Sequence, residues 1–352
     1  MNKSNIRAAD KIESKKRNLS ALVTELHFKN NPGLEKRYGE EGRERCLEDA
    51  NYHFSYLIEA LRVDSDALFS HYLEWAWQML GARNIPKDDL IENIGYMIKA
   101  VEKSLPAADA EPVISILETG AESLKNLQPK NETWIGFDNP LLEEASEYLN
   151  LLLNGKRNDA GDLIDKLVND GKTVADIYEH IFEATQYEVG VLWQRNEITV
   201  AHEHYCTAAT QLIMARLYPL IFGTEKKGMN LVACSVANEL HEIGIRMVSD
   251  FFEMDGWDTY YLGSNLPAAH LIQSLREHKA DVLALSVTLP VHISKLKTLI
   301  EQIRSLTEFD NMKIMAGGYP FTIVSGLDKK VGADATALSA KEAIKTANQM
   351  MA

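Results

Sequence analysis

Apolar residues recur at spacings of three and four from about residue 34 to residue 127, and no β-branched run of strand length interrupts them. This period is that of amphipathic helices, so the pattern predicts an all-helical first domain over residues 1–130. Pro86, Pro106 and Pro129 are expected to end helices, because proline lacks an amide donor and restrains the residue before it. The charged segment ahead of residue 34 is expected to be a frayed tail or a polar helix.

A second helical pattern runs from about residue 141 to residue 222, after a linker expected at residues 128–140. Turn signals divide this pattern at Asn154-Gly155, Asp170-Gly171 and Arg195-Asn196. The resulting helices are of ordinary length, and four of them fit. They predict a small four-helix bundle at residues 140–224.

The pattern changes after Gly223, where short β-rich runs alternate with helical stretches of about ten to fifteen residues. This alternation is typical of a parallel sheet with crossover helices. Five strands are expected, at residues 229–236, 258–262, 282–288, 313–316 and 333–338. Residues 228–352 are therefore expected to form a Rossmann-like, flavodoxin-like α/β domain. Such domains bind ligands beyond the carboxyl ends of their strands.

Composition limits the function further. The chain has 51 Asp and Glu against 37 Lys and Arg, a balance that repels phosphate backbones, so direct nucleic-acid binding is not expected. No run approaches the roughly 18 apolar residues of a membrane helix, and the N-terminus has no apolar signal region. Cys46, Cys206 and Cys234 lie far apart, which argues against a disulfide framework or structural zinc and favours the cytoplasm.

Residues suited to holding a ligand follow four of the expected strands. Glu239 and His241 follow the first strand; neutral imidazole is a good ligand for a borderline metal such as cobalt, and a carboxylate can hold its other nitrogen. Gly244 is expected to let the chain turn tightly into the next helix. The residues after the next three strands are small or carry hydroxyls: Ser264, Ser286, Thr288, Gly317 and Gly318. Turn chemistry could explain any one of these loops, but together they predict a deep slot for a bulky flat group.

With these residues, the region from about residue 229 to residue 352 resembles the cobalamin-binding domain shared by methionine synthase, the mutases and corrinoid proteins. The family pattern is Asp-x-His-x-x-Gly, then Ser-x-Thr or Ser-x-Leu, then Gly-Gly. This chain has Glu239-Leu240-His241-Glu242-Ile243-Gly244, Ser286-Val287-Thr288 and Gly317-Gly318. The resemblance implies that the dimethylbenzimidazole tail leaves the cobalt and enters the slot, while His241 becomes the lower axial ligand. Glu239 stands where the family usually has Asp, and the longer side chain can still reach the imidazole.

The second helical set resembles the cap of light-sensing adenosylcobalamin regulators, whose pattern is Trp, nine residues, then Glu-His. Trp193, Glu203 and His204 match this pattern, and Val200 lies in the first turn of the helix that carries the last two. The resemblance implies that Trp193 covers the 5′-deoxyadenosyl group, that Glu203 hydrogen-bonds it, and that His204 can ligate cobalt once light expels it. Those regulators often have histidine where this chain has Gln194, which leaves their oligomer contacts in doubt.

The first helical domain shows no helix-turn-helix unit of the kind those regulators carry. It has aromatic and basic residues at helical spacings instead: Tyr52, Tyr56, His71, Trp75 and Arg83. Such spacing is typical of a core. The arrangement also looks like the photocobilins, cobalamin photoreceptors that carry a bilin, and this resemblance implies that the N-terminal helices help to hold biliverdin.

Two functions follow. The first is a cytoplasmic cobalamin photoreceptor, not an enzyme, in which light cleaves the cobalt–carbon bond of adenosylcobalamin and changes the assembly of a homo-oligomer, with biliverdin as a candidate second chromophore. The alternative is a corrinoid methyl-carrier protein of a methyltransferase system, which shares the slot and the lower histidine but must leave the upper face open to a partner. The sequence identifies neither the downstream partner, the oligomer size nor the reversibility of photolysis.

Overall fold

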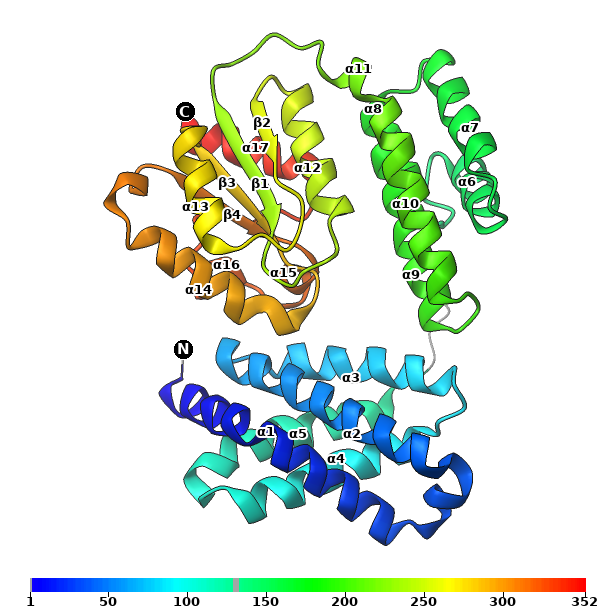
Figure 1. Cartoon of the computed structure of the whole chain (residues 1–352), viewed down its shortest axis with the longest axis vertical. Coiled ribbons are helices and arrows are strands. Elements are labelled where there is room, and N and C mark those ends of the chain that lie inside the picture. The colour runs from blue at the N-terminus through cyan, green and yellow to red at the C-terminus, as the bar shows by residue number, and fades with distance from the viewer. Residues whose placement is uncertain (1, 129–132) are drawn as a thin grey trace. The chain divides into compact units, whose positions relative to one another are not determined.

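The computed structural model describes residues 2–128 and 133–352, and its contacts divide the chain into two units (Figure 1). The first unit contains the N-terminal helices together with Leu289–Thr298 and Tyr319–Val331. The second contains residues 133–288, Leu299–Gly318 and Gly332–Ala352. Part of the expected linker, residues 129–132, lies outside the described residues. Each unit is described by itself.

Five helices build the N-terminal part of the first unit: α1 (Lys3–Asn30), α2 (Pro32–Val63), α3 (Asp66–Gly81), α4 (Lys87–Ser104) and α5 (Ala107–Asn126). The charged N-terminal segment is a regular helix, because Ala8, Ile12 and Leu19 bury one face of it. Pro86 and Pro106 lie at the expected breaks between helices, but each directly precedes the start of the next helix, α4 and α5. The break between α2 and α3 lies at Asp64, which adopts a left-handed conformation with φ of 55°.

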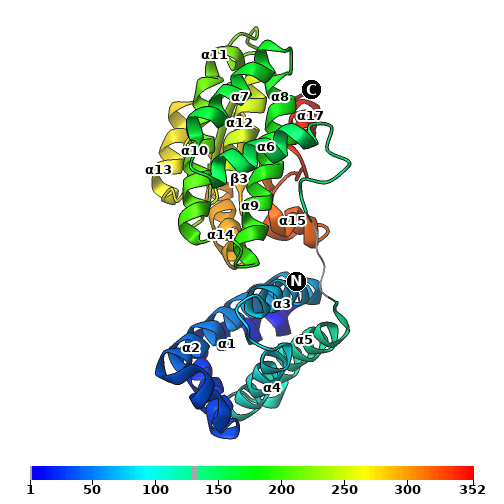
Figure 2. The same cartoon turned by 90° about the vertical axis from the view of Figure 1, so that its right-hand side faces the viewer.

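The second unit begins with a helical domain made of α6 (Leu142–Leu153), α7 (Arg157–Asn169), α8 (Val174–Ile177), a π-helical turn (Tyr178–Glu183), α9 (Ala184–Gln194), α10 (Val200–Arg216) and α11 (Tyr218–Ile221). The elements from α8 to α9 follow one another without a break, so four long helices form the expected bundle. Its core includes Tyr148, Tyr178 and Phe182, all fully buried. Met247 and Phe251 of the α/β domain join this core, and the bundle lies in front of the sheet in Figure 2.

The α/β domain has a parallel sheet of four strands in the order β2-β1-β3-β4: β1 (Asn230–Ser235), β2 (Asp258–Tyr261), β3 (Val282–Ser286) and β4 (Lys313–Gly317). The expected fifth strand, at residues 333–338, is reduced to a single parallel bridge between Met315 and Ala335. The backbone there still donates from Asp334 to Ile314 and from Ala316 to Ala335. The segment therefore extends the sheet without forming a full ladder.

Helices and short turns follow the strands: α12 (Ile243–Met254), α13 (Ala268–Glu277), a 3₁₀ turn (Pro290–His292), α14 (Ile293–Arg304), a second 3₁₀ turn (Thr307–Phe309), α15 (Tyr319–Ile323), α16 (Leu327–Val331) and α17 (Ala340–Met351). In the second unit, Phe252 and Trp257 are fully buried against the sheet. The order of the strands, with β1 beside β3, is that of flavodoxin-like folds and places the ligand crevice between the loops after these two strands.

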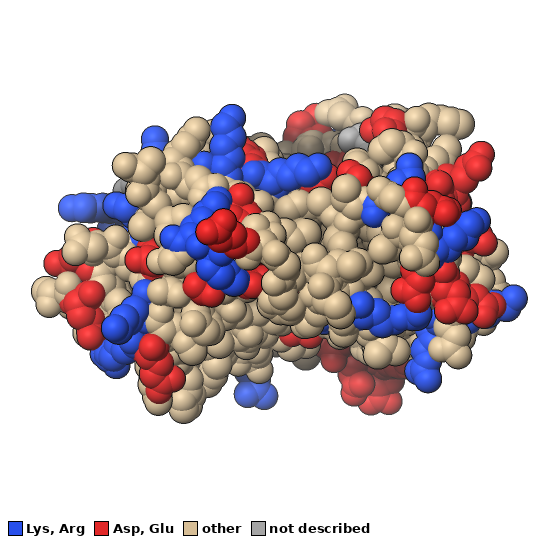
Figure 3. Space-filling model, turned by 90° about the horizontal axis from the view of Figure 1, so that it is seen from above, with Lys and Arg blue, Asp and Glu red and all other residues tan. Residues whose placement is uncertain are grey.

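On the face shown in Figure 3, Lys and Arg alternate with Asp and Glu and do not gather into one basic patch. This agrees with the formal net charge of −14. None of the helices in the part of the chain that the structure describes is long and apolar enough to cross a membrane.

Candidate functional site

The loop after β1 brings Glu239 and His241 together. Nδ1 of His241 lies 2.5 Å from Oε1 of Glu239, and the backbone N–H of His241 donates to the same oxygen at 3.1 Å. The hydroxyl of Ser235, at the end of β1, donates to the carbonyl of His241 at 3.0 Å. The histidine is therefore fixed through both its backbone and its ring, and glutamate in place of aspartate does reach the imidazole.

The carboxylate of Glu239 also ties this loop to the loop after β3. Its second oxygen, Oε2, accepts the backbone N–H of Thr288 at 2.9 Å, and the residue is 0 % exposed. A buried carboxylate is costly unless it is hydrogen-bonded, and these three N–H groups supply that compensation. Glu239 thus holds the two loops together at the crevice between β1 and β3.

The contact with Glu239 sets the tautomer of His241. A carboxylate only accepts, so Nδ1 must carry the proton and Nε2 is left with its lone pair. The His241 side chain is 56 % exposed, whereas its carboxylate partner is buried. An imidazole oriented by a buried carboxylate through one nitrogen, with the other available, is the usual arrangement of a metal-ligating histidine.

The ends of the four strands form one row. The Ser235 N–H donates to the carbonyl of Gly263 at 3.0 Å, Ser235 pairs with Ser286, and Ser286 pairs with Gly317. Ser264 follows directly after Gly263, and Thr288 lies two residues after Ser286. The structure therefore brings the expected small and hydroxyl-bearing residues to one edge of the sheet.

Two glycines at this edge have roles other than those that the sequence suggests. Gly244 is the second residue of α12 and has no positive φ, so the expectation that it permits a tight turn is wrong. A Cβ at Gly244 would meet nothing within 4 Å, which leaves open space beside the His241 loop. Gly318 has φ of +108°, and a Cβ there would lie 2.0 Å from the carbonyl oxygen of Val287. Gly318 is thus required for packing the loop after β4 against the loop after β3.

Sequence reasoning missed three further residues at this edge. Leu240 is 72 % exposed and Leu338, after the segment that extends the sheet, is 64 % exposed. Thr336 lies on that same segment, and its buried hydroxyl has no hydrogen-bond partner among the described residues. Exposed leucines and an unsatisfied buried hydroxyl are what a large ligand with apolar and polar parts would cover, so these residues fit a corrinoid with an inserted tail.

The loop between α9 and α10 lies at the same end of the second unit as the carboxyl ends of the strands (Figure 1). Trp193 is in the last turn of α9, and exposed Val200 is the first residue of α10. One turn later, a carboxylate oxygen of Glu203 contacts Nδ1 of His204. The other carboxylate oxygen accepts the hydroxyl of Thr207 at 2.9 Å. The residues expected over the upper face are thus gathered at one end of the helical bundle.

A polar line on α12 joins the helical domain to the α/β domain, and the sequence analysis did not identify it. Glu242, Arg246 and Asp250 are spaced by four residues, so they share one helix face. Gln211 of α10 donates to Glu242 at 2.7 Å. Tyr178 donates its hydroxyl to Asp250 at 2.8 Å. Burial raises the pKa of Asp250 to about 6, while the hydrogen bond from Tyr178 acts in the opposite direction.

The aromatic residues of the N-terminal helices pack largely on one another. Tyr56 stacks on Tyr72 with ring centroids 3.7 Å apart, and the ring of Trp75 lies 6.3 Å from that of Tyr72. Tyr52 is exposed. His71 reaches the hydroxyl of Tyr319 at 3.0 Å, whereas Arg83, in the turn after α3, donates to the carbonyl of Met79 in the last turn of that helix. The expected set of five residues is therefore spread over different surroundings.

Among the described residues, no group of three or more His, Cys, Asp or Glu side chains could hold a bare metal ion. The arrangement around His241 offers one nitrogen ligand only. This donor set fits a metal whose equatorial ligands come with the cofactor, as the macrocycle of a corrinoid provides.

Comparison with known proteins gives two family matches, both to models described as a B12 binding domain. One covers residues 229–347 and the other residues 144–218. A dimethylamine corrinoid protein of Methanosarcina barkeri is 28 % identical over 181 residues, 51 % of this chain and 84 % of the relative. Dimethylamine corrinoid protein 1 of Methanosarcina mazei is 26 % identical over 219 residues, 60 % of this chain and 96 % of the relative.

The solved structure of the Methanosarcina barkeri monomethylamine corrinoid protein aligns with 60 % of this chain and 100 % of its own, at 22 % identity and a TM-score of 0.54. This likeness shows a shared fold. The two family matches cover the helical bundle and the α/β domain that carry the site. Residues 144–218 and 229–347 are therefore B12-binding domains, and this chain is a cobalamin-binding protein whose cofactor is a cobalt corrinoid.

Proposed function

We propose that this chain holds its cobalamin with the dimethylbenzimidazole tail detached from the cobalt and with Nε2 of His241 as the lower axial ligand. The observation that carries this proposal is the contact of Nδ1 with buried Glu239, which orients the ring and leaves Nε2 as the nitrogen with a lone pair. Replacing His241 by alanine tests it. The His-on spectrum should be lost together with most of the affinity for cobalamin.

The detached tail would occupy the slot at the carboxyl edge of the sheet. We assign to its lining the small and hydroxyl-bearing residues Ser264, Ser286, Thr288, Gly317 and Gly318, which the structure aligns at that edge. Thr336 adds a buried, unsatisfied hydroxyl on the segment whose backbone lies beside Gly317, since a Cβ on Gly317 would be 3.5 Å from the carbonyl oxygen of Ala337. A Thr336→Val substitution, which keeps the shape, should weaken cobalamin binding without unfolding the domain.

The function that the relatives favour is that of a corrinoid methyl carrier, the alternative of the two expected from the sequence. In that function the bound corrinoid would supply the site that carries a methyl group between two partners. The names of the relatives, dimethylamine and monomethylamine corrinoid proteins, support this reading, and the aligned part includes both B12-binding domains.

A light-responsive sensor is the second candidate, and one specific observation favours it. Trp193 and the Glu203–His204 pair lie at the end of the bundle nearest the carboxyl edge of the sheet, where they could cover an adenosyl group (Figure 1). Contact with Glu203 through Nδ1 leaves Nε2 of His204 as the nitrogen that could approach cobalt after the adenosyl group leaves.

One experiment separates the two functions. The dissociation constants of adenosylcobalamin and methylcobalamin are compared in the dark, and the adenosylcobalamin complex is then illuminated with green light and run on a sizing column. A sensor should prefer adenosylcobalamin, change its elution in light and give a lit spectrum that His204→Ala alters. A carrier should show no preference for the adenosyl form, and its elution should be unchanged by light.

A further inference from the structure

The N-terminal helices contact two stretches of chain that follow the loops after β3 and β4. In the first unit these helices are grouped with Leu289–Thr298, which follows β3, and with Tyr319–Val331, which follows β4. The residues just ahead of these stretches are Thr288, whose N–H binds Glu239, and Gly318, which packs on Val287. Contacts that hold the first stretch therefore begin one residue after Thr288, which binds the carboxylate that orients His241.

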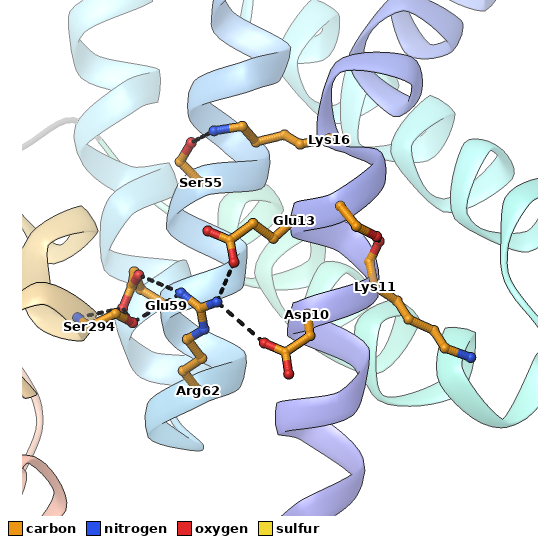
Figure 4. Close-up of polar contacts among 9 residues, drawn as sticks. Asp10, Lys11, Glu13, Lys16, Ser55, Glu59, Arg62 and Ser294 are labelled. Carbon is orange, nitrogen blue, oxygen red and sulfur yellow. Dashed lines mark hydrogen bonds and ion pairs between the residues drawn. The ribbon is translucent and has the colours of Figure 1, made fainter. Parts of the chain in front are cut away.

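The first contact is a hydrogen-bonded cap on α14. Both the backbone N–H and the hydroxyl of Ser294 donate to one oxygen of Glu59, at 3.1 and 2.6 Å (Figure 4). The first N–H groups of a helix have no partners within it, and its N-terminus attracts negative charge. Glu59 of α2 thus caps the first turn of α14.

An arginine holds the capping carboxylate in place. Arg62, one turn after Glu59, lies between that carboxylate and the hydroxyl of Ser294, at 3.4 and 3.1 Å. Its other nitrogen contacts Glu13 at 2.5 Å and Asp10 at 3.4 Å, both on α1 (Figure 4). Glu59 is 4 % exposed, whereas Asp10 and Glu13 are exposed. The buried pair of hydrogen bonds is therefore the part of this cluster that water cannot replace easily.

Two more contacts hold the stretch that follows β4. The Lys330 ammonium lies 2.5 Å from the carbonyl oxygen of Val63, the last residue of α2, where a positive charge complements the helix dipole. His71 of α3 contacts the hydroxyl of Tyr319, the residue after Gly318. Neighbouring turns of α2 thus contact both stretches, and α3 adds a contact to the second.

We propose that the N-terminal helical domain positions the cobalamin slot, with Glu59 as a positioning residue that fixes the start of α14 and through it the loop that ends at Thr288. Cobalamin binding and the contact between Glu59 and Ser294 are then coupled, so each strengthens the other by the same factor. The inference rests on cobalamin binding by the α/β domain, and only its spectral test rests on His241 as the lower ligand.

The test compares Glu59→Gln with Glu13→Gln in the full-length chain. Both substitutions remove one carboxylate charge near Arg62, but only the first also weakens the acceptor of Ser294, because a glutamine amide offers one acceptor oxygen to the two donors Arg62 and Ser294. With Glu59→Gln, the amide of Ser294 should exchange with solvent faster, the dissociation constant of cobalamin should rise about fivefold, and the His-on fraction of the spectrum should fall. Glu13→Gln should leave all three within about twofold of the wild type.

A second variant covers the case in which Glu59→Gln disturbs α2 itself. Ser294→Ala removes the hydroxyl from the other side of the contact, and its effect on the dissociation constant should not add to that of Glu59→Gln, because the two share one interaction. Unchanged cobalamin binding in both variants, or fully additive effects, would overturn the proposal. A wild type that never shows the His-on spectrum would instead refute the assignment of His241 and leave the exchange and affinity tests standing.

Discussion

Replacing Glu239 by glutamine should weaken cobalamin binding and also lower the stability of the apoprotein. Glutamine keeps the length and shape of the side chain but replaces one acceptor oxygen by an NH₂ donor. Glu239 accepts N–H groups of His241 and Thr288 and contacts Nδ1 of His241. One of these donors would then face another donor, and the imidazole would lose its charged partner.

The size of the effect follows from these contacts. Loss of a carboxylate that orients a metal-ligating histidine typically costs about 10- to 100-fold in affinity, or about 1.4 to 2.8 kcal/mol. In the apoprotein the same substitution leaves a buried N–H group facing an NH₂ group, and a buried donor without an acceptor typically costs about 1 to 3 kcal/mol. The free energy of unfolding of the apo form should therefore fall by about 1 to 3 kcal/mol.

The measurement pairs a cobalamin titration with denaturant unfolding of the apoprotein. Glu242→Gln is the matched control, since that carboxylate is three residues further on, contacts Gln211 and touches neither nitrogen of His241. A Glu239→Gln variant that binds cobalamin as tightly as the wild type would refute the reasoning. So would equal weakening by both substitutions, because the loss would then come from the loop in general.

Three other predictions concern the upper face, the domain contact and the N-terminal helices. Trp193→Ala should reduce any preference for adenosylcobalamin over methylcobalamin, measured as the ratio of their dissociation constants, and an unchanged ratio would make Trp193 an ordinary packing residue. The raised pKa of Asp250 means that the folded protein binds a proton at this carboxyl more readily than the unfolded chain does, so the stability from this group is lost as the pH rises through about 6. Asp250→Asn should flatten this pH dependence and raise the free energy of unfolding at pH 8 by about 2 kcal/mol, measured by urea titration. A red-absorbing band after production of the full-length protein with biliverdin would support a bilin site in the N-terminal helices, and no such band would exclude it.

The α/β domain could be predicted from the alternation of strands and helices, because buried parallel strands are short apolar runs and each ends at a ligand-facing loop. The four strands of the sheet were found within about two residues of their ends. The fifth was overestimated, since its segment makes one bridge only and is held by backbone bonds that leave no pattern in the sequence. Proline marked two breaks between helices correctly, where Pro86 and Pro106 precede the next helix, but the break at Asp64 contains neither proline nor glycine.

The roles of the glycines at the site were the least predictable from the sequence. Gly244 looked like a turn residue, yet it lies inside a helix, and Gly318 looked like space for a ligand, yet it is needed where two loops pack. A Gly318→Leu substitution, which would seem the natural way to block the slot, would therefore clash with the backbone of Val287 and disturb the fold as well as the site.

Contacts between distant parts of the chain could not be read from the sequence. Glu59 and Ser294 are 235 positions apart, and nothing in either segment identifies the other. The line of Glu242, Arg246 and Asp250 had a visible signal, since polar residues at every fourth position of an otherwise apolar helix indicate a face with polar neighbours. The neighbours themselves came only from the fold.

The most direct test of the central claim is electron paramagnetic resonance of the cob(II)alamin complex made with ¹⁵N-histidine-labelled protein. If His241 is the lower ligand, the nitrogen splitting of the cobalt lines should change from the triplets of ¹⁴N to the doublets of ¹⁵N, and His204→Ala should leave this change intact. Triplets that persist in the labelled protein would show that the cofactor's own base, and not a histidine of this chain, still binds the cobalt.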